Sequence, residues 1–262
     1  MSPLPLPAFL RSAAGLAGRM LDIVFPRYCA VCGKMLATGE RHVCTTCFVG
    51  LPFTRFRGAP GNVVERLFWG RIPIERANAL LRYRIDSASR HIFFKFKYHD
   101  RPGVGHFFGR VMARDLCSTG FFDGIDVIVP LPLHPHKERN RGYNQSEALA
   151  RGVAAITGLP VLTGAVARII DTPTQTHLTP DERRRNVHGA FRLVRPETVA
   201  GRHVLLVDDV LTTNATLMAC AEAMLAADGV RFSILVLGLA GRHPAGGHSF
   251  HAWWREEPGA EE

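Results

Sequence analysis

The sequence predicts an α/β protein with a mostly parallel sheet and helices on both faces, preceded by a small zinc-ribbon-like module. Segments typical of strands alternate with segments of helical periodicity, and several of the strands are hydrophobic at successive positions. Such continuous hydrophobic strands are typical of parallel sheets covered on both faces. Four cysteines in two C-x-x-C pairs near the N-terminus indicate the metal module.

Length and composition limit the class of protein. The 262 residues suffice for one α/β domain and a small appendage. Hydrophobic residues make up 47% and charged residues 21% of the chain, which is typical of a globular protein. No apolar run of about 18 residues is present, so we expect no membrane span. The net charge of +9 favours a phosphate-bearing partner, either a nucleotide or a nucleic acid.

Residues 1–25 are expected to form an amphipathic helix, because apolar residues recur there at helical spacing. Arg11 and Arg19 interrupt this segment before the core of a signal peptide can develop. Cys117 and Cys220 are expected to be buried core residues, which leaves no disulfide framework of a secreted domain. We therefore expect a cytoplasmic protein.

Residues 26–56 are predicted to form the zinc-ribbon-like module. The metal ligands are expected to be four cysteines, with eleven residues between the two pairs: Cys29, Cys32, Cys44 and Cys47. Four thiolates match the closed coordination of structural zinc, and the bound ion would stabilise a segment that has little core of its own. Redox-active cysteine pairs are the alternative. His42 is expected to be a surface residue.

A connector around residues 57–62 leads to a domain expected over residues 72–242, and residues 243–262 form a tail with an acidic end. Apolar runs predict strands at residues 77–84, 125–132, 161–169, 203–208 and 231–240. Helical spacing and capping residues predict helices at residues 88–99, 104–116, 144–157 and 214–227.

The strand at residues 203–208 ends in two carboxylates, Asp208 and Asp209, and is followed by small hydroxyl-bearing residues. Ligands of open α/β sheets bind beyond the carboxyl ends of the strands. Small side chains let backbone N–H groups approach a phosphate, and the N-terminus of the next helix favours the same anion. Carboxylates beside such a loop can bind a diol, so the segment predicts a site for a ribose 5-phosphate.

The stretch VLLVDDVLTTNAT (204–216) resembles the phosphoribosyl pyrophosphate (PRPP) motif of type I phosphoribosyltransferases. The resemblance implies that Asp208 and Asp209 bind the ribose hydroxyls and that the following loop binds the 5-phosphate. The implied PRPP-binding residues are Asp208, Asp209, Val210, Thr212, Thr213, Asn214, Ala215 and Thr216. The family usually has Gly where this chain has Asn214, a residue that tolerates left-handed backbone geometry.

Two further stretches, residues 130–150 and 171–191, resemble the ComF family of competence-associated proteins, as does a four-cysteine module before the transferase-like domain. The resemblance spans nearly all of residues 10–240. It implies a pyrophosphate loop whose residues are Lys137, Arg139, Arg141, Gly142, Asn144 and Gln145. It also implies a flexible loop that closes over the reacting centre and contains Gln175, Arg183 and Asn186, with Arg183 joining Asp208 and Asp209 as catalytic residues.

The implied reaction is Mg²⁺-assisted displacement of pyrophosphate from PRPP by a nitrogen nucleophile. Three hypotheses remain open: a phosphoribosyltransferase with an unspecified acceptor, a PRPP or nucleotide sensor without turnover, and an accessory protein that handles single-stranded DNA during uptake. For the last, basic loops would contact phosphates and exposed aromatic side chains would stack on bases. The aromatic candidates are Phe48, Phe53, Phe56 and Trp69, each of which is first expected to be a core residue.

Overall fold

The computed structural model describes residues 26–83, 102–171, 189–212 and 214–241. The chain divides into two compact units, Met1–Leu51 and Pro52–Glu262. The helices expected at residues 1–25 and 88–99 and the tail at 243–262 lie outside the described residues. In the described part of the chain, no helix has both the length and the apolar character needed to cross a membrane.

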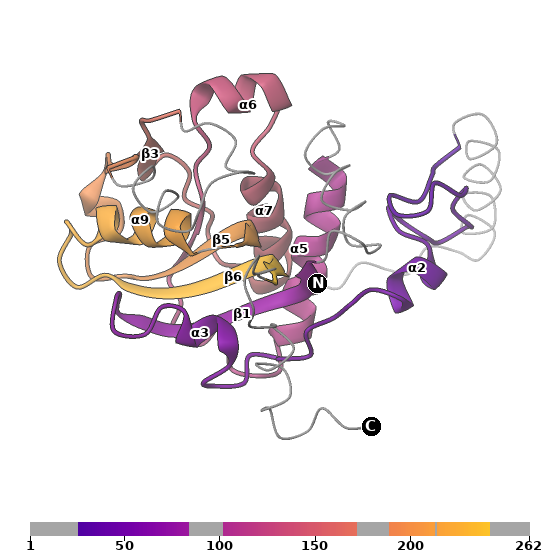
Figure 1. Cartoon of the computed structure of the whole chain (residues 1–262), viewed down its shortest axis with the longest axis horizontal. Coiled ribbons are helices and arrows are strands. Elements are labelled where there is room, and N and C mark those ends of the chain that lie inside the picture. Colours follow the sequence, from indigo (N-terminus) through magenta and orange to yellow (C-terminus); the bar gives the residue numbers. More distant parts are fainter. Residues whose placement is uncertain (1–25, 84–101, 172–188, 213, 242–262) are drawn as a thin grey trace, which may run out of the picture. The chain divides into compact units, whose positions relative to one another are not determined.

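Four parallel strands form the sheet of the second unit in the order β1-β6-β5-β2 (Figure 1). Their bounds are Ile74–Tyr83 for β1, Val127–Pro130 for β2, His203–Leu211 for β5 and Arg231–Ala240 for β6. The central strands are continuously hydrophobic because both of their faces are buried, and Val204 to Val207 have no exposed surface. The predicted α/β class with a mostly parallel sheet is confirmed.

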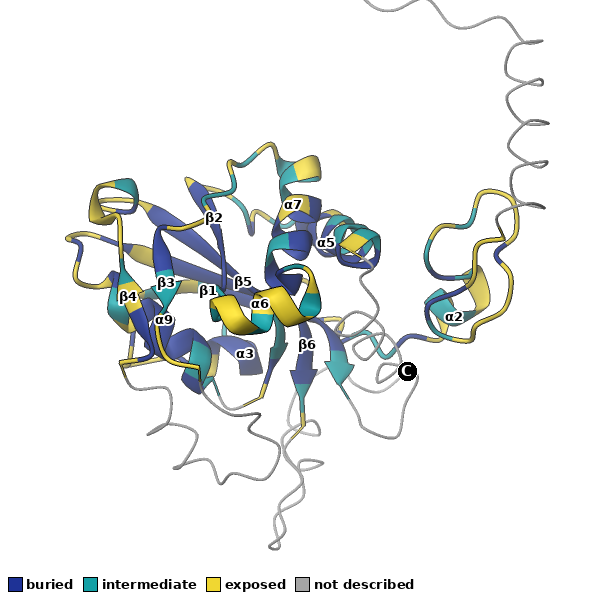
Figure 2. Ribbon diagram, turned by 90° about the horizontal axis from the view of Figure 1, so that it is seen from above, coloured by how far each residue is buried: buried dark blue, intermediate teal, exposed yellow. Residues whose placement is uncertain are grey.

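Helices cover both faces of this sheet (Figure 2). Helices α5 (Pro102–Leu116) and α7 (Gln145–Thr157) pack together on one face, where α7 contacts β5 and β2. On the other face, helix α9 (Ala215–Met224) and the short helix α3 (Val63–Arg66) share one core cluster with alternate residues of the strands. Asn144 begins α7 as a cap, since its Oδ1 accepts the Ser146 N–H at 3.0 Å.

The strand expected at residues 161–169 is divided between two places. Val161 forms an isolated parallel bridge with Ile128 at the outer side of β2. The later residues form β3 (Val166–Arg168), which pairs antiparallel with β4 (Phe191–Leu193) in a separate two-stranded sheet. The prediction of one continuous strand was wrong because Gly164, at φ +75°, turns the chain between the two pairings.

Residues 52–72 pack along the outer edge of β1, within the second unit. Phe53 pairs with Leu81 in an antiparallel bridge, so this edge of the sheet is covered. Five apolar side chains of the segment are buried in the core: Phe56, Val63, Val64, Phe68 and Ile72. The Pro/Gly-containing stretch at 57–62 is therefore an ordered part of the sheet unit, and its glycines serve left-handed turns.

Glycines allow α5 and α7 to cross with their backbones in contact. A Cβ atom added to Gly109 would lie 2.1 Å from Leu149 O, and one added to Gly152 would lie 2.3 Å from His106 O. Neither site can accept a methyl group unless the two helices move apart. This crossing fixes α7, whose first turn approaches the end of β5.

Replacement of Gly109 by Ala should therefore lower the free energy of unfolding of the sheet unit by about 1–3 kcal/mol. Urea unfolding followed by circular dichroism measures the change. Arg110→Ala, at the next position of the same helix, is the matched control and should change stability by less than about 0.5 kcal/mol. Equal stability of Gly109→Ala and the parent chain would contradict the close crossing.

The two cysteines outside the C-x-x-C pairs differ in exposure. Cys220 lies in α9 and is fully buried, as predicted. The prediction for Cys117 was wrong, because this residue follows the last residue of α5 and its thiol is exposed. The Cys117 S–H donates to the carbonyl oxygen of Arg114 at 3.4 Å.

Candidate functional site: a zinc module and a sugar-phosphate pocket

The four cysteines of the two C-x-x-C pairs lie together in the first unit. The Sγ atoms of Cys29, Cys32, Cys44 and Cys47 all lie within 4.8 Å of one another, and those of Cys32 and Cys44 are 3.8 Å apart. A tetrahedral zinc site with Zn–S bonds of about 2.3 Å has S–S separations of about 3.8 Å. The donor set and its spacing therefore fit one structural zinc ion.

Local turns bring these cysteines together. Gly33 has φ +73°, and its N–H donates to Cys29 O at 3.0 Å, which closes the first turn. Helix α2 (Thr45–Val49) begins directly after Cys44. The Glu40 carboxylate accepts the Thr45 N–H at 2.7 Å, and this bond lowers the pKa of Glu40. The Glu40 contact thereby fixes the start of α2 beside the second pair.

The pKa values of Cys29 and Cys47 are shifted in opposite directions. Burial disfavours the Cys29 thiolate, but N–H groups of Cys44, Cys32 and Val31 donate to its sulfur, so its pKa is lowered to about 6. Burial and the neighbouring thiols raise the pKa of Cys47. A bound divalent cation would stabilise all four thiolates, so metal binding should release protons and weaken as the pH falls.

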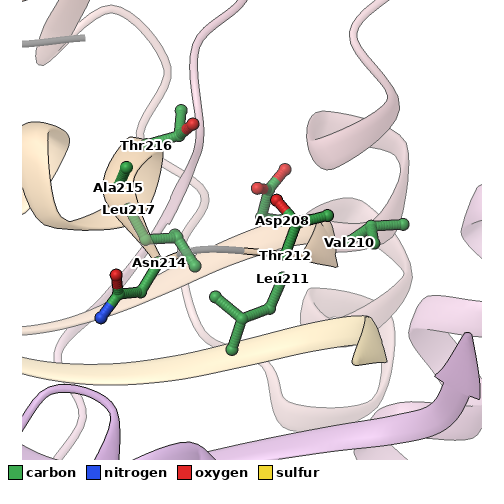
Figure 3. Close-up of a pocket in the computed structure, with 8 residues that line it drawn as sticks. All are labelled: Asp208, Val210, Leu211, Thr212, Asn214, Ala215, Thr216 and Leu217. Atoms are coloured by element: carbon green, nitrogen blue, oxygen red, sulfur yellow. The ribbon is translucent and has the colours of Figure 1, made fainter. Parts of the chain in front are cut away.

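A second candidate site lies at the carboxyl end of β5, in the other unit. A pocket at this strand end is lined by Asp208, Val210, Leu211, Thr212, Asn214, Ala215, Thr216 and Leu217. Figure 3 shows the Asp208 carboxylate and the Thr216 hydroxyl on the same side of the strand end, whereas the Asn214 amide is turned the other way. The pocket thus combines a carboxylate, hydroxyl groups and the N-terminal end of α9.

Asp208 is buried and held in one orientation. Its Oδ1 accepts the Ser146 hydroxyl at 2.9 Å and the Asp209 N–H at 2.8 Å. Ser146 lies in the first turn of α7, so the α5–α7 crossing and the strand end are connected through this bond. These two bonds fix the orientation of the carboxylate at the pocket.

Asp209 is not among the residues that line this pocket. Successive side chains of an extended strand point to opposite faces, so Asp209 points away from the face of Asp208. It is half-buried, and its Oδ1 accepts the Val210 N–H at 2.7 Å. Thr213 lies outside the described residues.

Asn214 adopts the left-handed conformation, with φ +54° and ψ −13°, immediately before α9. Its side chain does not cap the helix, but its Nδ2 donates to Leu67 O at 2.6 Å. Leu67 directly follows α3, so this bond joins the loop that is expected to bind phosphate to the segment that covers β1. A glycine at this position would adopt the same backbone geometry but could not form the bond.

Two substitutions separate these contributions of Asn214. Asn214→Ala removes the hydrogen bond and keeps the unfavourable left-handed residue, so the free energy of unfolding should fall by about 1–3 kcal/mol. Asn214→Gly also loses the bond, but glycine adopts the left-handed conformation without strain. The decrease in the free energy of unfolding should therefore be smaller by about 1 kcal/mol. Urea unfolding of both variants tests this, and an alanine variant as stable as the parent would contradict the role of the Leu67 contact.

The predicted pyrophosphate loop contains a short, largely exposed helix, α6 (Pro135–Arg141), that ends at the left-handed Gly142 (Figure 2). Lys137 and Arg141 are one helical turn apart and half-buried, whereas Arg139 is exposed. The structure thus brings Lys137 and Arg141 together and leaves Arg139 outside. Gln145 accepts a hydrogen bond from Arg141 at 2.9 Å through its Oε1. Asn144 caps α7 and donates to Leu131 O at 3.0 Å.

Arg168 is a site residue that sequence reasoning missed. It lies in β3, and its guanidinium carbon is 5.4 Å from the centre of the Phe191 ring. Burial lowers the pKa of Arg168, while the negative charges of Asp208 and Asp171 oppose this shift. Its charge in turn contributes, after burial, to lowering the pKa of Lys137. Arg168 therefore connects the carboxylate of the pocket electrostatically with the cations of α6.

Asp171 lies beside α6, three residues after Arg168. Its Oδ2 is 3.0 Å from His136 Nδ1, and its Oδ1 is 3.5 Å from Lys137 Nζ. The hydrogen bond from His136 lowers the pKa of Asp171. The predicted flexible-loop residues Gln175, Arg183 and Asn186 lie outside the described residues.

Comparison with known proteins supports the zinc module and identifies relatives over most of the chain. The family model of the double zinc ribbon domain matches residues 20–57. The DNA utilization protein YhgH of Salmonella typhi is 27% identical over 218 residues, which cover 78% of this chain and 92% of that protein. The Escherichia coli protein of the same name is 28% identical over 200 residues, covering 75% and 83% of the two chains.

A third relative decides the family. Competence protein F of Haemophilus influenzae is 30% identical over 194 residues, which cover 74% of this chain and 76% of that protein. The chain belongs to the ComF family. The resemblance predicted from the separate sequence motifs is thereby confirmed.

The segment of this ComF-family chain that matches the double zinc ribbon domain, residues 20–57, contains four cysteines. Four thiolate ligands are enough for one zinc ion. The single cluster found among the described residues agrees with this number. The module therefore supports one structural zinc ion in this ComF-family protein.

Proposed function

We propose that this ComF-family protein binds PRPP with Mg²⁺ and transfers the phosphoribosyl group to a nitrogen acceptor. One observation carries the proposal: the pocket at the end of β5 combines the buried carboxylate of Asp208 with the Thr212–Thr216 loop and the start of α9. A diol and a phosphate separated by a ribose ring match this combination.

The 5-phosphate would bind the loop after β5. Backbone N–H groups at the start of α9 and the hydroxyl groups of Thr212, Thr213 and Thr216 are its proposed donors. The Asp208 carboxylate would accept hydrogen bonds from the ribose hydroxyls. We assign Asp209 to binding of the diol because it matches the family motif. Because Asp209 does not line the pocket, it would contact the diol less directly than Asp208.

The diphosphate would bind beside α6. Lys137 and Arg141 supply positive charge there, and Arg168 supplies a third, half-buried charge that interacts with Asp208. An arriving diphosphate would stabilise these mutually repelling cations, and the fork of an arginine suits phosphate oxygens. Gly142, Asn144 and Gln145 would form the backbone of this loop, and Arg139 would act only if the loop moves.

Bound Mg²⁺ would neutralise the diphosphate and so assist its departure from the anomeric carbon. Acidic residues and PRPP oxygens are the hard oxygen ligands that this ion prefers. The chain itself would orient the ribose, hold the leaving group and exclude water. Arg183, with Gln175 and Asn186, would contribute to exclusion of water and is assigned by its match to the family motif.

The names of the relatives suggest the context of this activity. They refer to DNA utilization and to competence. We therefore propose that the protein acts in DNA utilization or uptake and that single-stranded DNA is a second partner. A PRPP sensor without turnover is the alternative, and it is favoured by Asn214 at a position where the family usually has Gly.

Calorimetric titration of the zinc-loaded full chain with PRPP, with and without Mg²⁺, tests the proposal. We expect saturable binding that strengthens when Mg²⁺ is present. A screen of nitrogen acceptors for pyrophosphate release then separates the alternatives, since binding without release from any acceptor indicates a sensor. Absence of PRPP binding under both conditions would overturn the phosphoribosyl assignment.

A further inference from the structure

Four arginines are exposed on the segment that covers β1: Arg55, Arg57, Arg66 and Arg71. The segment's only acidic residue, Glu65, is buried, and its carboxylate accepts the N–H groups of Gly61 and Ala77. Asp115 of α5 is 3.8 Å from the Nε atom of Arg57, which remains highly exposed. The segment thus presents guanidinium groups to solvent and no carboxylate of its own.

An exposed aromatic side chain belongs to the same segment as these arginines. Trp69 is 55% exposed, whereas Phe56 is buried and Phe48 and Phe53 are half-buried. Of the four aromatic residues considered for base stacking, only Trp69 therefore offers an open ring. A tryptophan is usually buried in large part, so this exposure calls for an explanation beyond core packing.

The side chains of Trp69 and Arg66 both approach Gly61. The Trp69 ring tip lies 3.9 Å from the position that a Cβ atom would take on Gly61. Arg66 Nε donates to the carbonyl oxygen of Gly61 at 2.7 Å. The cationic side chain and the aromatic side chain therefore approach the same glycine of the segment.

The backbone that presents these side chains is ordered and locally strained. Arg55 and Arg57 both have positive φ, at 61° and 48°, on either side of the buried Phe56. Left-handed non-glycine residues cost energy and are frequent at functional sites. Buried Asn62 stabilises this path, because its Nδ2 donates to Ala59 O and Ala77 O, both at 2.8 Å.

We propose that the Arg–Trp surface, formed by Arg55, Arg57, Arg66, Arg71 and Trp69, binds single-stranded DNA. The arginines would contact successive backbone phosphates and Trp69 would stack on an unpaired base. The stacking contact favours single strands, because the bases of a duplex are already stacked on one another. The inference rests on the proposed DNA role of the protein and is independent of the phosphoribosyl site.

Fluorescence anisotropy of a labelled 20-nucleotide oligo-dT with the zinc-loaded full chain, in the absence of PRPP, tests this surface. Trp69→Ala should weaken binding by between about 5-fold and about 100-fold, and Trp69→Phe should restore most of it. Arg66→Gln and Arg71→Gln should each reduce the slope of log K against log salt by about 0.7. Arg202→Gln, an exposed arginine after η1 (Pro196–Thr198), is the matched control and should leave affinity and slope unchanged.

Two results would overturn the inference. Parent-like oligo-dT binding by Trp69→Ala and the arginine variants would place the DNA site elsewhere and leave the DNA role intact. Failure of the parent chain to bind oligo-dT, or tighter binding of a duplex of the same length, would reject the single-strand role itself. PRPP titration of the same variants keeps these outcomes separate from failure of the phosphoribosyl assignment.

Discussion

Asp208→Asn is expected to weaken PRPP binding by about 100-fold or more while the sheet unit remains folded. The amide oxygen of Asn can still accept the Ser146 hydroxyl and the Asp209 N–H, so the contacts that orient the side chain persist. The negative charge that would bind the ribose diol is lost, and hydrogen bonds to a charged group contribute about 1.5–3 kcal/mol each. Calorimetric titration with PRPP and Mg²⁺ measures the change.

Thermal unfolding must accompany this titration, because Asp208 also stabilises the half-buried charge of Arg168. Asp228→Asn, an exposed acidic residue away from the pocket, is the matched control and should retain parental affinity. If Asp208→Asn binds PRPP normally, the pocket is not a diol site. If it instead unfolds at a much lower temperature, the carboxylate has a structural role and the functional assignment loses its main support.

Cys44→Ser is expected to remove about one zinc ion per chain and to unfold the first unit. This short segment depends on its metal, and structural zinc contributes about 10–16 kcal/mol to the folding of zinc-finger peptides. Metal content by native mass spectrometry gives the stoichiometry, and amide hydrogen exchange reports which segments lose protection. Protection should be lost at residues 26–51, whereas β5 and β6 should keep it because they belong to the other compact unit.

Cys117→Ser is the matched control, since it removes an exposed thiol outside the cluster. It should leave both the zinc content and the exchange pattern unchanged. A Cys44→Ser protein that retains its zinc and its protection at residues 26–51 would contradict the four-thiolate site. Acid should also release zinc from the parent chain, because protons compete with the metal for the thiolates.

The sheet was largely predictable, because burial on both faces produces a direct hydrophobic signal. The strand expected at residues 231–240 is β6, with the same bounds. The antiparallel pair of β3 and β4 was not predictable, since each strand has three residues and their pairing joins distant parts of the chain. The role of the segment along β1 was hidden by its prolines and glycines, which resemble those of a linker.

The candidate sites were predictable where they are contiguous in sequence. The cysteine spacing predicted a cluster that the structure brings together. Most of the residues that line the pocket lie within the stretch at residues 208–216. Arg168 escaped detection because only the fold brings β3 close to the end of β5. The sequence analysis placed the side chains of Asp208 and Asp209 at the same site because it ended the strand at Asp208. The strand continues to Leu211, so successive side chains point to opposite faces through both residues.

The bridge between Phe53 and Leu81 affects how the chain can be shortened. A fragment that starts at Pro52 keeps the natural cover over the outermost hydrogen-bonding groups of β1. A fragment that starts near Ile74 would expose these groups and the hydrophobic residues beneath them, and such open borders recruit other molecules into sheets. Insolubility of the shorter fragment would then reflect the uncovered border together with the loss of core residues such as Phe56 and Phe68.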